Sequence, residues 1–451
     1  MALRWPICSF LEQRFTNLLI ILTIKVGLDK LIKSYKGQRL KFLSIFKYKN
    51  FKKLYLAATL SEFGSFITDT AIMLWLYSLV GESKAWLGIS RTTFIFSYAL
   101  GSIAGGSFKN YKYFTKILFW ADIVRFPLIV AMLFTTSPVV IVTLAGLIAF
   151  FQGIFSPLRQ SLTNIFVPQR SIKLANSLFS TTMAFLHLLC PYIGSFLYTT
   201  MNSMNVIVTI DGTTYLLSAL LIYFITHEKT NDSKNHTEEK PNEEKYRYKK
   251  ALQKQGITTI LTNYCILGTL VGLLIPLLLP YTIDVLQKTN YEYGILMLFF
   301  GLGGLIGGLT SELISEKFST NKIIIVTFFL EICMMMIWLQ FKNFWVSSFL
   351  LMLWGQIVFT RMPAQFNFVS ETVETNLLPA VHSLLQIAFL VPNLIGSMIV
   401  VFVGDILSTL DLLTYASYTF IALALIRLFS PDLQKFFIQS PEKIKRSTVV
   451  D

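Results

Sequence analysis

The sequence predicts an all-α integral membrane protein with twelve transmembrane helices in two six-helix bundles. Of its 451 residues, 54% are hydrophobic and only 14% are charged, whereas about 25% are charged in an ordinary soluble domain. Mean hydropathy is +0.59, which excludes a disordered chain and argues against a soluble enzyme. The net charge of +14 is concentrated at the chain ends and in short loops, whereas a nucleic-acid-binding protein would carry it on polar domains.

Twelve apolar runs after residue 50 are long enough to cross a bilayer, which needs about 20 residues per helix. The predicted spans are 53–80, 86–108, 115–136, 139–163, 174–200, 205–226, 257–285, 291–313, 322–340, 344–367, 379–403 and 411–430. Residues 51–226 would form the first bundle and residues 257–430 the second. Residues 227–256 between them would form a polar cytoplasmic linker, of which the strongly polar stretch 227–250 is expected to be solvated and flexible, and residues 431–451 would form a cytoplasmic tail.

Residues 1–50 form a basic extension of a different character. Its longest apolar run, around residues 17–28, contains Lys25 and is too short to span a membrane. It lacks a small-residue cleavage site, so we do not interpret it as a signal peptide. A basic helix lying on the membrane surface is one interpretation, and a translation start downstream of Met1 is the other.

The distribution of lysine and arginine predicts the topology. With the N-terminus in the cytoplasm, 32 of the 39 basic residues fall in cytoplasmic segments and three in outer loops. Because positive residues accumulate on the cytoplasmic side, we expect both termini and the linker to be cytoplasmic. The expected location is the cytoplasmic membrane of a bacterium.

The two halves of the sequence resemble each other. Small residues permit close helix approach and prolines interrupt helices, so their recurrence at one offset indicates a repeat of the kind that builds transporters. The matched positions are Gly101 and Gly105 with Gly303 and Gly307, Gly194 with Gly396, and Pro157 with Pro363. The first three pairs are separated by 202 residues and the proline pair by 206.

Three segments carry a resemblance to a known family: residues 51–83, KILFWADIVR at 116–125, and GIFSPLRQSLTNIFVPQRSIKLANSLFS at 153–180. Over residues 50–430 the chain resembles the major facilitator superfamily, in particular its macrolide-efflux and bacilysin-exporter-like branch. The resemblance implies two helical bundles around a central cavity lined mainly by the first, fourth, seventh and tenth helices. It also implies export by alternating access.

The sequence departs from that family in two motifs. The loop after the second helix normally carries an Asp-Arg pair, and here Asn110 and Tyr111 occupy those places, whereas Glu316 and Lys317 keep a charged counterpart in the second half. The resemblance therefore implies that a cytoplasmic charge contact is weakened in the first half. The antiporter motif Gly-Pro-x-x-Gly-Gly appears at residues 190–195 with only Pro191 and Gly194 retained.

Two acidic residues in the first helix are the leading candidates for proton coupling. Glu62 and Asp69 lie seven residues apart, close to two turns, so they share a helix face. Ionisable groups inside a membrane are costly and indicate function, and a carboxylate in a low-dielectric cavity holds a proton more readily than in water. The alternative interpretation is structural hydrogen bonding at a helix contact.

Other polar residues within the spans complete the predicted site. Asp122 and Arg125 are three residues apart and predict an ion pair that positions a gate. A substrate or coupling role is assigned to Gln152, Arg159, Gln356 and Arg361, with Arg159 alternatively reaching lipid phosphates. For Glu331 we expect bonding to a neighbouring helix. Pro157, Pro191, Gly194 and Pro363 are assigned to gating and helix flexibility.

Secondary active transport is the predicted function. No GxxxxGK[ST] motif is present, so we expect a proton gradient, and neither nucleotide nor another cofactor, to supply energy. The expected cargo is a hydrophobic or amphiphilic small molecule such as an antibiotic, a peptide-like metabolite or a siderophore. The expected protein is a monomer in the lipid bilayer that binds no metal or nucleic acid. The alternatives are a lipid-modifying membrane enzyme and a non-transporting interaction protein.

Overall fold

The computed structural model describes residues 45–108, 113–225, 248–254, 256–374 and 377–438, and the regular elements within these ranges are helical. The first half contains six long helices. They are α2 (Lys49–Leu79), α3 (Lys84–Ser107), α4 (Phe114–Ala131) with the short 3-10 helix η2 (Met132–Phe134), α5 (Pro138–Phe166), α6 (Gln169–Met201) and α7 (Met204–Tyr223).

The second half repeats this arrangement. Its helices are α9 (Ile257–Pro280) with the π-helical turn η3 (Tyr281–Val285), α10 (Asn290–Lys317), α11 (Thr320–Leu339), α12 (Phe344–Thr372), α13 (Leu378–Val403) and α14 (Thr409–Leu428). A short helix, α15 (Pro431–Ile438), follows.

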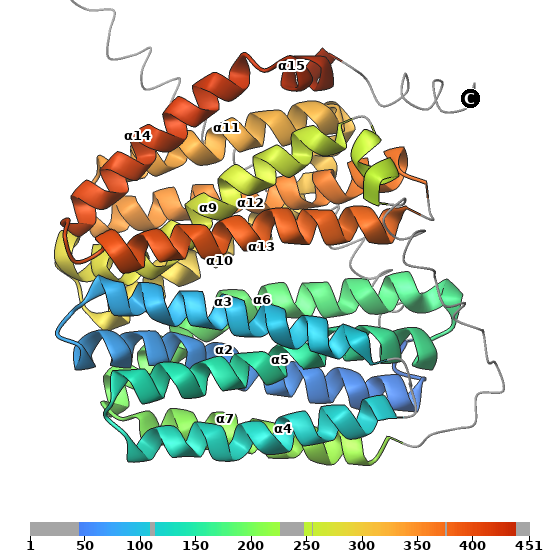
Figure 1. Ribbon diagram of the computed structural model, residues 1–451, viewed down its shortest axis with the longest axis vertical. Helices are drawn as coiled ribbons and strands as arrows, with labels where there is room; N and C mark the ends of the chain where they lie inside the picture. Colours follow the sequence, from blue (N-terminus) through green and yellow to red (C-terminus); the bar gives the residue numbers. More distant parts are fainter. Residues whose placement is uncertain (1–44, 109–112, 226–247, 255, 375–376, 439–451) are drawn as a thin grey trace, which may run out of the picture.

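The helices of each half form a bundle, and the two bundles lie side by side (Figure 1). The helices run back and forth between two ends of the molecule. We call the end at which residues 225 and 248 lie the linker end, and the opposite end, with the connections 80–83, 286–289 and 404–408, the short-loop end. Because each half has six helices, residues 45 and 438 also lie at the linker end.

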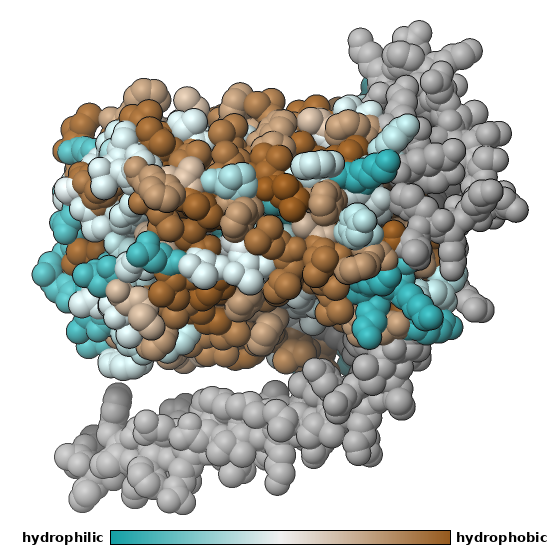
Figure 2. All heavy atoms as spheres, turned by 90° about the horizontal axis from the view of Figure 1, so that it is seen from below, coloured by the Kyte–Doolittle hydropathy of each residue, from teal (hydrophilic) through white to brown (hydrophobic). Residues whose placement is uncertain are grey.

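The helices match the dimensions of a bilayer. Ten of them are long and apolar enough to span it, and the two others, α2 and α3, have 31 and 24 residues and pack within the first bundle. Apolar side chains gather over much of the middle of the molecule's face in Figure 2, with polar ones toward both ends. Such a belt suits a multi-pass membrane protein, so the predicted twelve-helix architecture is confirmed.

The predicted spans differ from the helices mainly at the linker end. α6 begins five residues before the predicted span at 174, and α12 ends five residues after the predicted span at 367. The extra turn of α6, Gln169–Lys173, is mainly polar, whereas that of α12 begins with the buried Phe368 and Val369. Hydropathy locates the apolar core of a helix, whereas backbone hydrogen bonding continues the helix beyond the bilayer.

The ends of the predicted linker and tail pack against the second bundle. Ala251 is fully buried, and Lys254 pairs with Glu374 at 2.6 Å. This hydrogen bond holds the pKa of the Glu374 carboxyl below its usual value. Residues 248–254, at the end of the predicted linker, therefore pack on the second bundle, because a few apolar side chains suffice to anchor them.

The start of the tail is anchored by α15. Leu433 and Phe436 are buried, and the Asn321 side chain donates to the carbonyl oxygen of Phe436 at 2.9 Å. Arg427 of α14 pairs with Asp432 at 2.6 Å, and this hydrogen bond holds the pKa of Asp432 well below its usual value. Residues 1–44, which include most of the basic extension, lie outside the described residues.

The sequence repeat is also a repeat of contacts. Gly101 faces the carbonyl oxygen of Phe150, and Gly303 faces that of Met352, so both partners are offset by 202 residues. The same offset relates the contact of Gly194 with the Ile67 carbonyl to that of Gly396 with the Thr269 carbonyl. In each case the absence of a side chain lets two backbones meet. The two bundles therefore share one packing scheme.

We expect this scheme to be sensitive to a single methyl group. A Cβ at Gly303 would overlap the carbonyl oxygen of Met352, whereas a Cβ at Gly308 on the same helix would meet no atom within 4 Å. Gly303→Ala should destabilise the protein by about 1–3 kcal/mol because α10 and α12 must separate. Thermal unfolding in detergent should show a lower Tm for Gly303→Ala and an unchanged Tm for Gly308→Ala. Equal Tm values would refute the close contact.

Candidate functional site

The two bundles are joined at the short-loop end by a carboxylate of one half that caps a helix of the other. Asp405, after α13, accepts from the backbone N–H of Lys84 at 2.7 Å and of Ala85 at 3.1 Å, and from the Ser83 hydroxyl at 2.5 Å. The Ser83 side chain makes no cap of its own. The first N–H groups of a helix lack acceptors within the helix. Asp405 therefore supplies the acceptor for the first N–H groups of α3.

Further contacts between the halves lie toward the same end. The Lys84 ammonium donates to the Leu407 carbonyl at 2.8 Å, and the Thr92 and Ser397 hydroxyls are 2.9 Å apart. Ser195 of α6 donates to the carbonyl oxygen of Asn290 at the start of α10. Within the described ranges, every hydrogen bond that joins the bundles involves the half of the helices nearer the short-loop end. The bundles are therefore closed together at that end.

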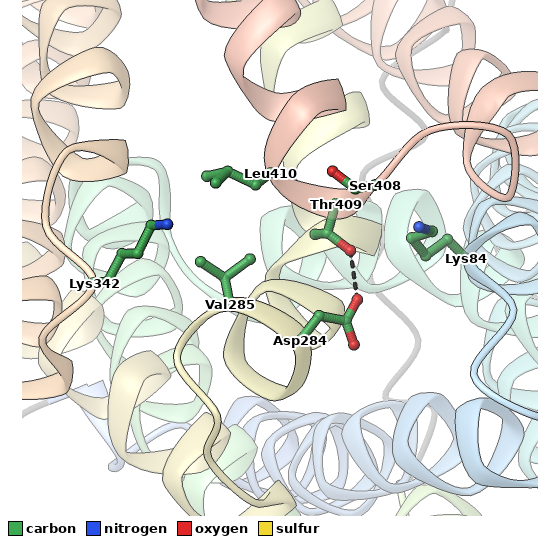
Figure 3. A pocket seen from close by; sticks show the side chains of 7 residues that line it. All are labelled: Lys84, Asp284, Val285, Lys342, Ser408, Thr409 and Leu410. Carbon is green, nitrogen blue, oxygen red and sulfur yellow. Dashed lines mark hydrogen bonds between the residues drawn. The ribbon is translucent and has the colours of Figure 1, made fainter.

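A pocket of about 370 Å³ opens beside this contact (Figure 3). Asp284 lines it and accepts from Thr409 at 2.5 Å and, across the interface, from Tyr77 at 3.3 Å. The side chains that line it are Lys84, Asp284, Val285, Lys342, Ser408, Thr409 and Leu410. The pocket lies at the closed short-loop end, away from the carboxyl residues of the first helix.

Asp122 and Arg125 form the expected ion pair in the first bundle. Arg125 Nη1 lies 2.9 Å from Asp122 Oδ1, and both side chains are almost completely buried. The other carboxylate oxygen of Asp122 accepts from Ser218 of α7 at 2.6 Å. The guanidinium also contacts Ser61 of α2 at 3.0 Å and lies 4.4 Å from the Tyr215 ring centroid. The pair therefore ties α4 to α2 and α7.

The structure brings together three of the predicted substrate and coupling residues. Gln152 of α5 donates to Glu62 of α2 at 2.9 Å. Arg159, two turns further along α5, interacts electrostatically with Glu62, and its guanidinium lies 4.5 Å from the Phe179 ring centroid. Gln152 is buried and Arg159 is half-buried. This places one positive charge beside one negative charge between α2 and α5.

Asp69 has a different environment. It is half-buried on α2, and among the described residues no hydrogen bond reaches its carboxyl group. Its main electrostatic neighbours are Asp211 of α7 and Arg91 of α3. Arg91 in turn interacts electrostatically with Tyr293 of the second bundle, and its Nε is buried without a hydrogen-bond partner among the described residues. Asp69 therefore interacts electrostatically with an arginine that also interacts with a residue of the other half.

Arg361 is neutralised within the second bundle. Its Nε lies 2.5 Å from Glu331 Oε1, its Nη2 lies 3.3 Å from Glu331 Oε2, and Nη1 donates to Gln365 at 2.8 Å. Both charged side chains are buried. The expected neighbouring-helix partner of Glu331 is thus Arg361. Because its donors are engaged, Arg361 holds α12 against α11.

The remaining predicted residues lie apart from these clusters. The helices continue without a break through Pro157, Pro191 and Pro363, and Gly194 packs on α2. Gln356 is half-buried on α12 beside Gly307. Glu316 and Lys317 are exposed at the end of α10, and within the described ranges Glu316 has no ion-pair partner. Asn110 and Tyr111 lie outside the described residues.

Three functional candidates escaped the sequence analysis: Asp211, Arg91 and Asp405. Asp211 and Arg91 lie within predicted spans, so the same rule that selected Asp69 would have selected them. Asp405 lies in a short loop, and its role as a cap for a helix 320 residues earlier leaves no mark in the sequence. Among the described residues, no group of three His, Cys, Asp or Glu side chains is close enough to hold a metal ion.

The ion pair between α11 and α12 makes a testable prediction. Arg361→Met alone should destabilise the protein by about 3–5 kcal/mol, because it leaves the Glu331 charge buried without a partner. The double variant Arg361→Met with Glu331→Leu should recover most of that loss, and thermal unfolding in detergent measures both. If the double variant is folded and still transports, Arg361 is structural. If it is folded but no longer transports, the Arg361–Glu331 pair does more than hold α11 and α12 together.

A family model described as the Major Facilitator Superfamily matches residues 54–397. No curated protein matches the sequence.

Several solved structures share the fold. The nucleoside transporter NupG has a TM-score of 0.65 at 10% identity and covers 87% of this chain and 100% of its own. A D-xylose-proton symporter has a TM-score of 0.64 at 14% identity, covering 84% of this chain and 98% of its own. A bacterial homologue of the iron transporter ferroportin, in an inward-facing state, has a TM-score of 0.64 at 12% identity, covering 87% and 99%. At these identities the likeness concerns the fold alone. The family model, however, matches well over half of the chain, and the chain therefore belongs to the Major Facilitator Superfamily.

Proposed function

We propose that this protein is a proton-coupled exporter of hydrophobic or amphiphilic small molecules that works by alternating access. The observation that carries the proposal is the combination of two bundles closed at one end with a carboxyl–arginine cluster inside the first bundle. Alternating access requires two halves that rock about a site between them. Proton coupling requires a carboxyl group that gains and loses a proton within the membrane.

The topology predicted from the basic residues indicates which side of the membrane the closed end faces. If the linker end is cytoplasmic, as the excess of lysine and arginine there favours, the closed short-loop end faces outward. The conformation is then inward-facing, with cargo admitted from the cytoplasm. We place the protein in the cytoplasmic membrane of a bacterium as a monomer, with both termini inside.

Asp69 is the proposed proton carrier. It interacts electrostatically with Arg91, and Arg91 interacts with Tyr293 of the other bundle. Protonation of Asp69 would release Arg91 from its negative neighbour and change the charge at the interface that must open. Glu62 is engaged by Gln152, and its position between α2 and α5 suits recognition of cargo.

The nature of the cargo rests on composition and resemblance. The chain contains 39 phenylalanines and 13 methionines, and such side chains line sites for bulky apolar ligands. The resemblance to the macrolide-efflux and bacilysin-exporter-like branch favours export over import. A second candidate function, a non-transporting interaction protein, is kept because Asn110 replaces the usual acidic residue of the cytoplasmic loop.

The proposal predicts that Asp69→Asn abolishes pH-gradient-driven efflux. The cargo is first identified as a compound, within a panel of amphiphilic antibiotics, to which expression of the gene confers resistance. Its uptake into inverted vesicles is then driven by an imposed pH gradient. Asp69→Asn cannot release a proton, so uphill transport should stop while downhill exchange of the compound persists.

Two further variants make this test selective. Asp411→Asn, an aspartate at the short-loop end, should transport at the wild-type rate. Glu62→Gln should mainly change which compounds are accepted. Wild-type uphill transport by Asp69→Asn would return Asp69 to a structural role, and absence of transport by the wild-type protein for every compound would favour the interaction protein.

The closed end yields a second prediction. Asp405→Ala removes the cap of α3, which costs about 1 kcal/mol and should shift the equilibrium toward opening of that end about fivefold. Spin labels at Thr136→Cys and Lys288→Cys, in a background without the native cysteines, report the distance between the two halves. Longer distances should become populated in Asp405→Ala, whereas Asp411→Ala, whose contacts stay within the second half, should leave the distribution unchanged. An unchanged distribution in Asp405→Ala would show that the cap does not hold the halves together.

A further inference from the structure

The interior of the first bundle holds more negative than positive side chains. Away from the helix ends, α2–α7 contain four carboxylic acids and three arginines: Glu62, Asp69, Asp122, Asp211, Arg91, Arg125 and Arg159. A buried charge without a partner is costly in a low-dielectric interior. A proton on one of the four acids would therefore balance the set.

The pairing of these residues identifies the acid that is left over. Arg125 forms an ion pair with Asp122 at 2.9 Å. Glu62 has Gln152 at 2.9 Å and Arg159 as its positive neighbour. Asp69 has Arg91. The positive neighbour of Asp211 is Arg125, which Asp122 already occupies.

The hydrogen bonding of Asp211 is equally incomplete. The side chain is 1% exposed, and its Oδ2 atom is buried without a hydrogen-bond partner. Oδ1 has only a 3.5 Å contact with the Thr214 hydroxyl, which donates to the Asp211 carbonyl at 2.7 Å instead. Thr68 and Tyr215 lie nearby, but neither hydroxyl forms a bond of normal geometry to Oδ2. An ionised carboxylate normally accepts several hydrogen bonds when buried, so this environment suits the neutral acid.

The elements packed against Asp211 bring few charges to it. α2 contributes Asp69, α4 contributes Arg125 with its partner Asp122, and α7 itself contributes Tyr215. Gly64 of α2 lies directly against the Asp211 side chain, so that a Cβ there would contact Oδ1. The absence of a side chain at Gly64 therefore lets the carboxyl group lie against α2, the helix that carries Asp69.

From this arrangement we infer that Asp211 is a second proton-binding residue, which holds a proton in this conformation and acts together with Asp69 of α2. The inference rests on the proposed function and extends it from one carboxyl group to two. The proton comes from hydronium and leaves water behind, so that the carboxylate becomes the neutral acid. Asp69 is half-buried and Asp211 is sealed, so Asp69 is the group through which the proton exchanges.

Two interacting carboxyl groups keep at least one proton between them, and this affects how proton binding is linked to transport. Both cannot be ionised together at low cost, because the second negative charge raises the energy of the first. When Asp69 is ionised beside Arg91, Asp211 keeps its proton. When the halves rearrange and Arg91 moves away, the pair retains its proton more firmly. Asp211 is thus a positioning residue: it binds the proton while Asp69 is ionised, and it influences when Asp69 carries a charge.

The inference is tested by infrared spectroscopy of the purified full-length protein at neutral pH, without any cargo. The protein should show the carbonyl-stretch band of a protonated carboxylic acid. Asp211→Asn should lose that band, and Asp211→Glu should retain it at a shifted frequency. Asp122→Asn is a poor control because it breaks an ion pair, so Asp284→Asn, at the short-loop end, serves instead and should keep the band.

The outcomes separate this inference from the proposed function. Loss of the band in Asp211→Asn, with persistence in Asp69→Asn, supports Asp211 as the proton-binding residue. An unchanged band in Asp211→Asn, in a protein whose far-ultraviolet circular dichroism shows that it is folded, overturns the inference. If Asp211→Asn is unfolded, the band of Asp211→Glu decides: an unshifted band overturns the inference. A wild-type protein that shows the band but no pH-gradient-driven transport contradicts the proposed function and leaves the protonation of Asp211 established.

Discussion

Compensation of charge inside a helical bundle is the constraint on which the rest of this structure depends. Each carboxylate or arginine within the membrane needs a partner, because no water is at hand to solvate it. The Asp122–Arg125 pair fixes α4 against α2 and α7, and the Glu331–Arg361 pair fixes α12 against α11. Where compensation is incomplete, as at Asp211, a bound proton can neutralise the carboxylate. The groups that stabilise the bundle and the groups that could couple it to a proton gradient therefore obey the same rule.

The two halves share packing contacts at glycines but pair their arginines differently. Backbone contacts at glycines recur at an offset of 202 residues in both bundles, and the same offset relates Arg159 to Arg361. Their environments have diverged, because Arg361 pairs with Glu331 whereas the residue 202 positions before Glu331 is Ile129. Arg159 lies near Glu62 instead. The second bundle uses its arginine to hold two helices together, and the first bundle keeps its arginine beside the residues proposed to recognise cargo.

The contact between the bundles also depends on carboxylates, which here accept hydrogen bonds near the surface. Asp405 satisfies the free N–H groups at the start of α3, and Asp284 accepts from a hydroxyl of each half. These bonds are few and lie at one end, so they can be exchanged for others when the halves rock. A large apolar interface over the whole length would favour a single arrangement. The short-loop end therefore combines closure with the capacity to reopen.

The sequence by itself determined the number and approximate limits of the helices, because apolar length is dictated by the bilayer. It also predicted the Asp122–Arg125 pair from local spacing and the repeat from glycine positions. It could not assign a partner to Glu331, nor reveal that residues 248–254 are anchored or that Asp405 caps α3, since each of these depends on groups distant in the chain. Asp211 was visible as a residue in a span, but only tertiary structure showed that Arg125, the arginine that interacts with it, is already paired with Asp122. Helix formation is a local property, whereas charge compensation is decided by which helices meet.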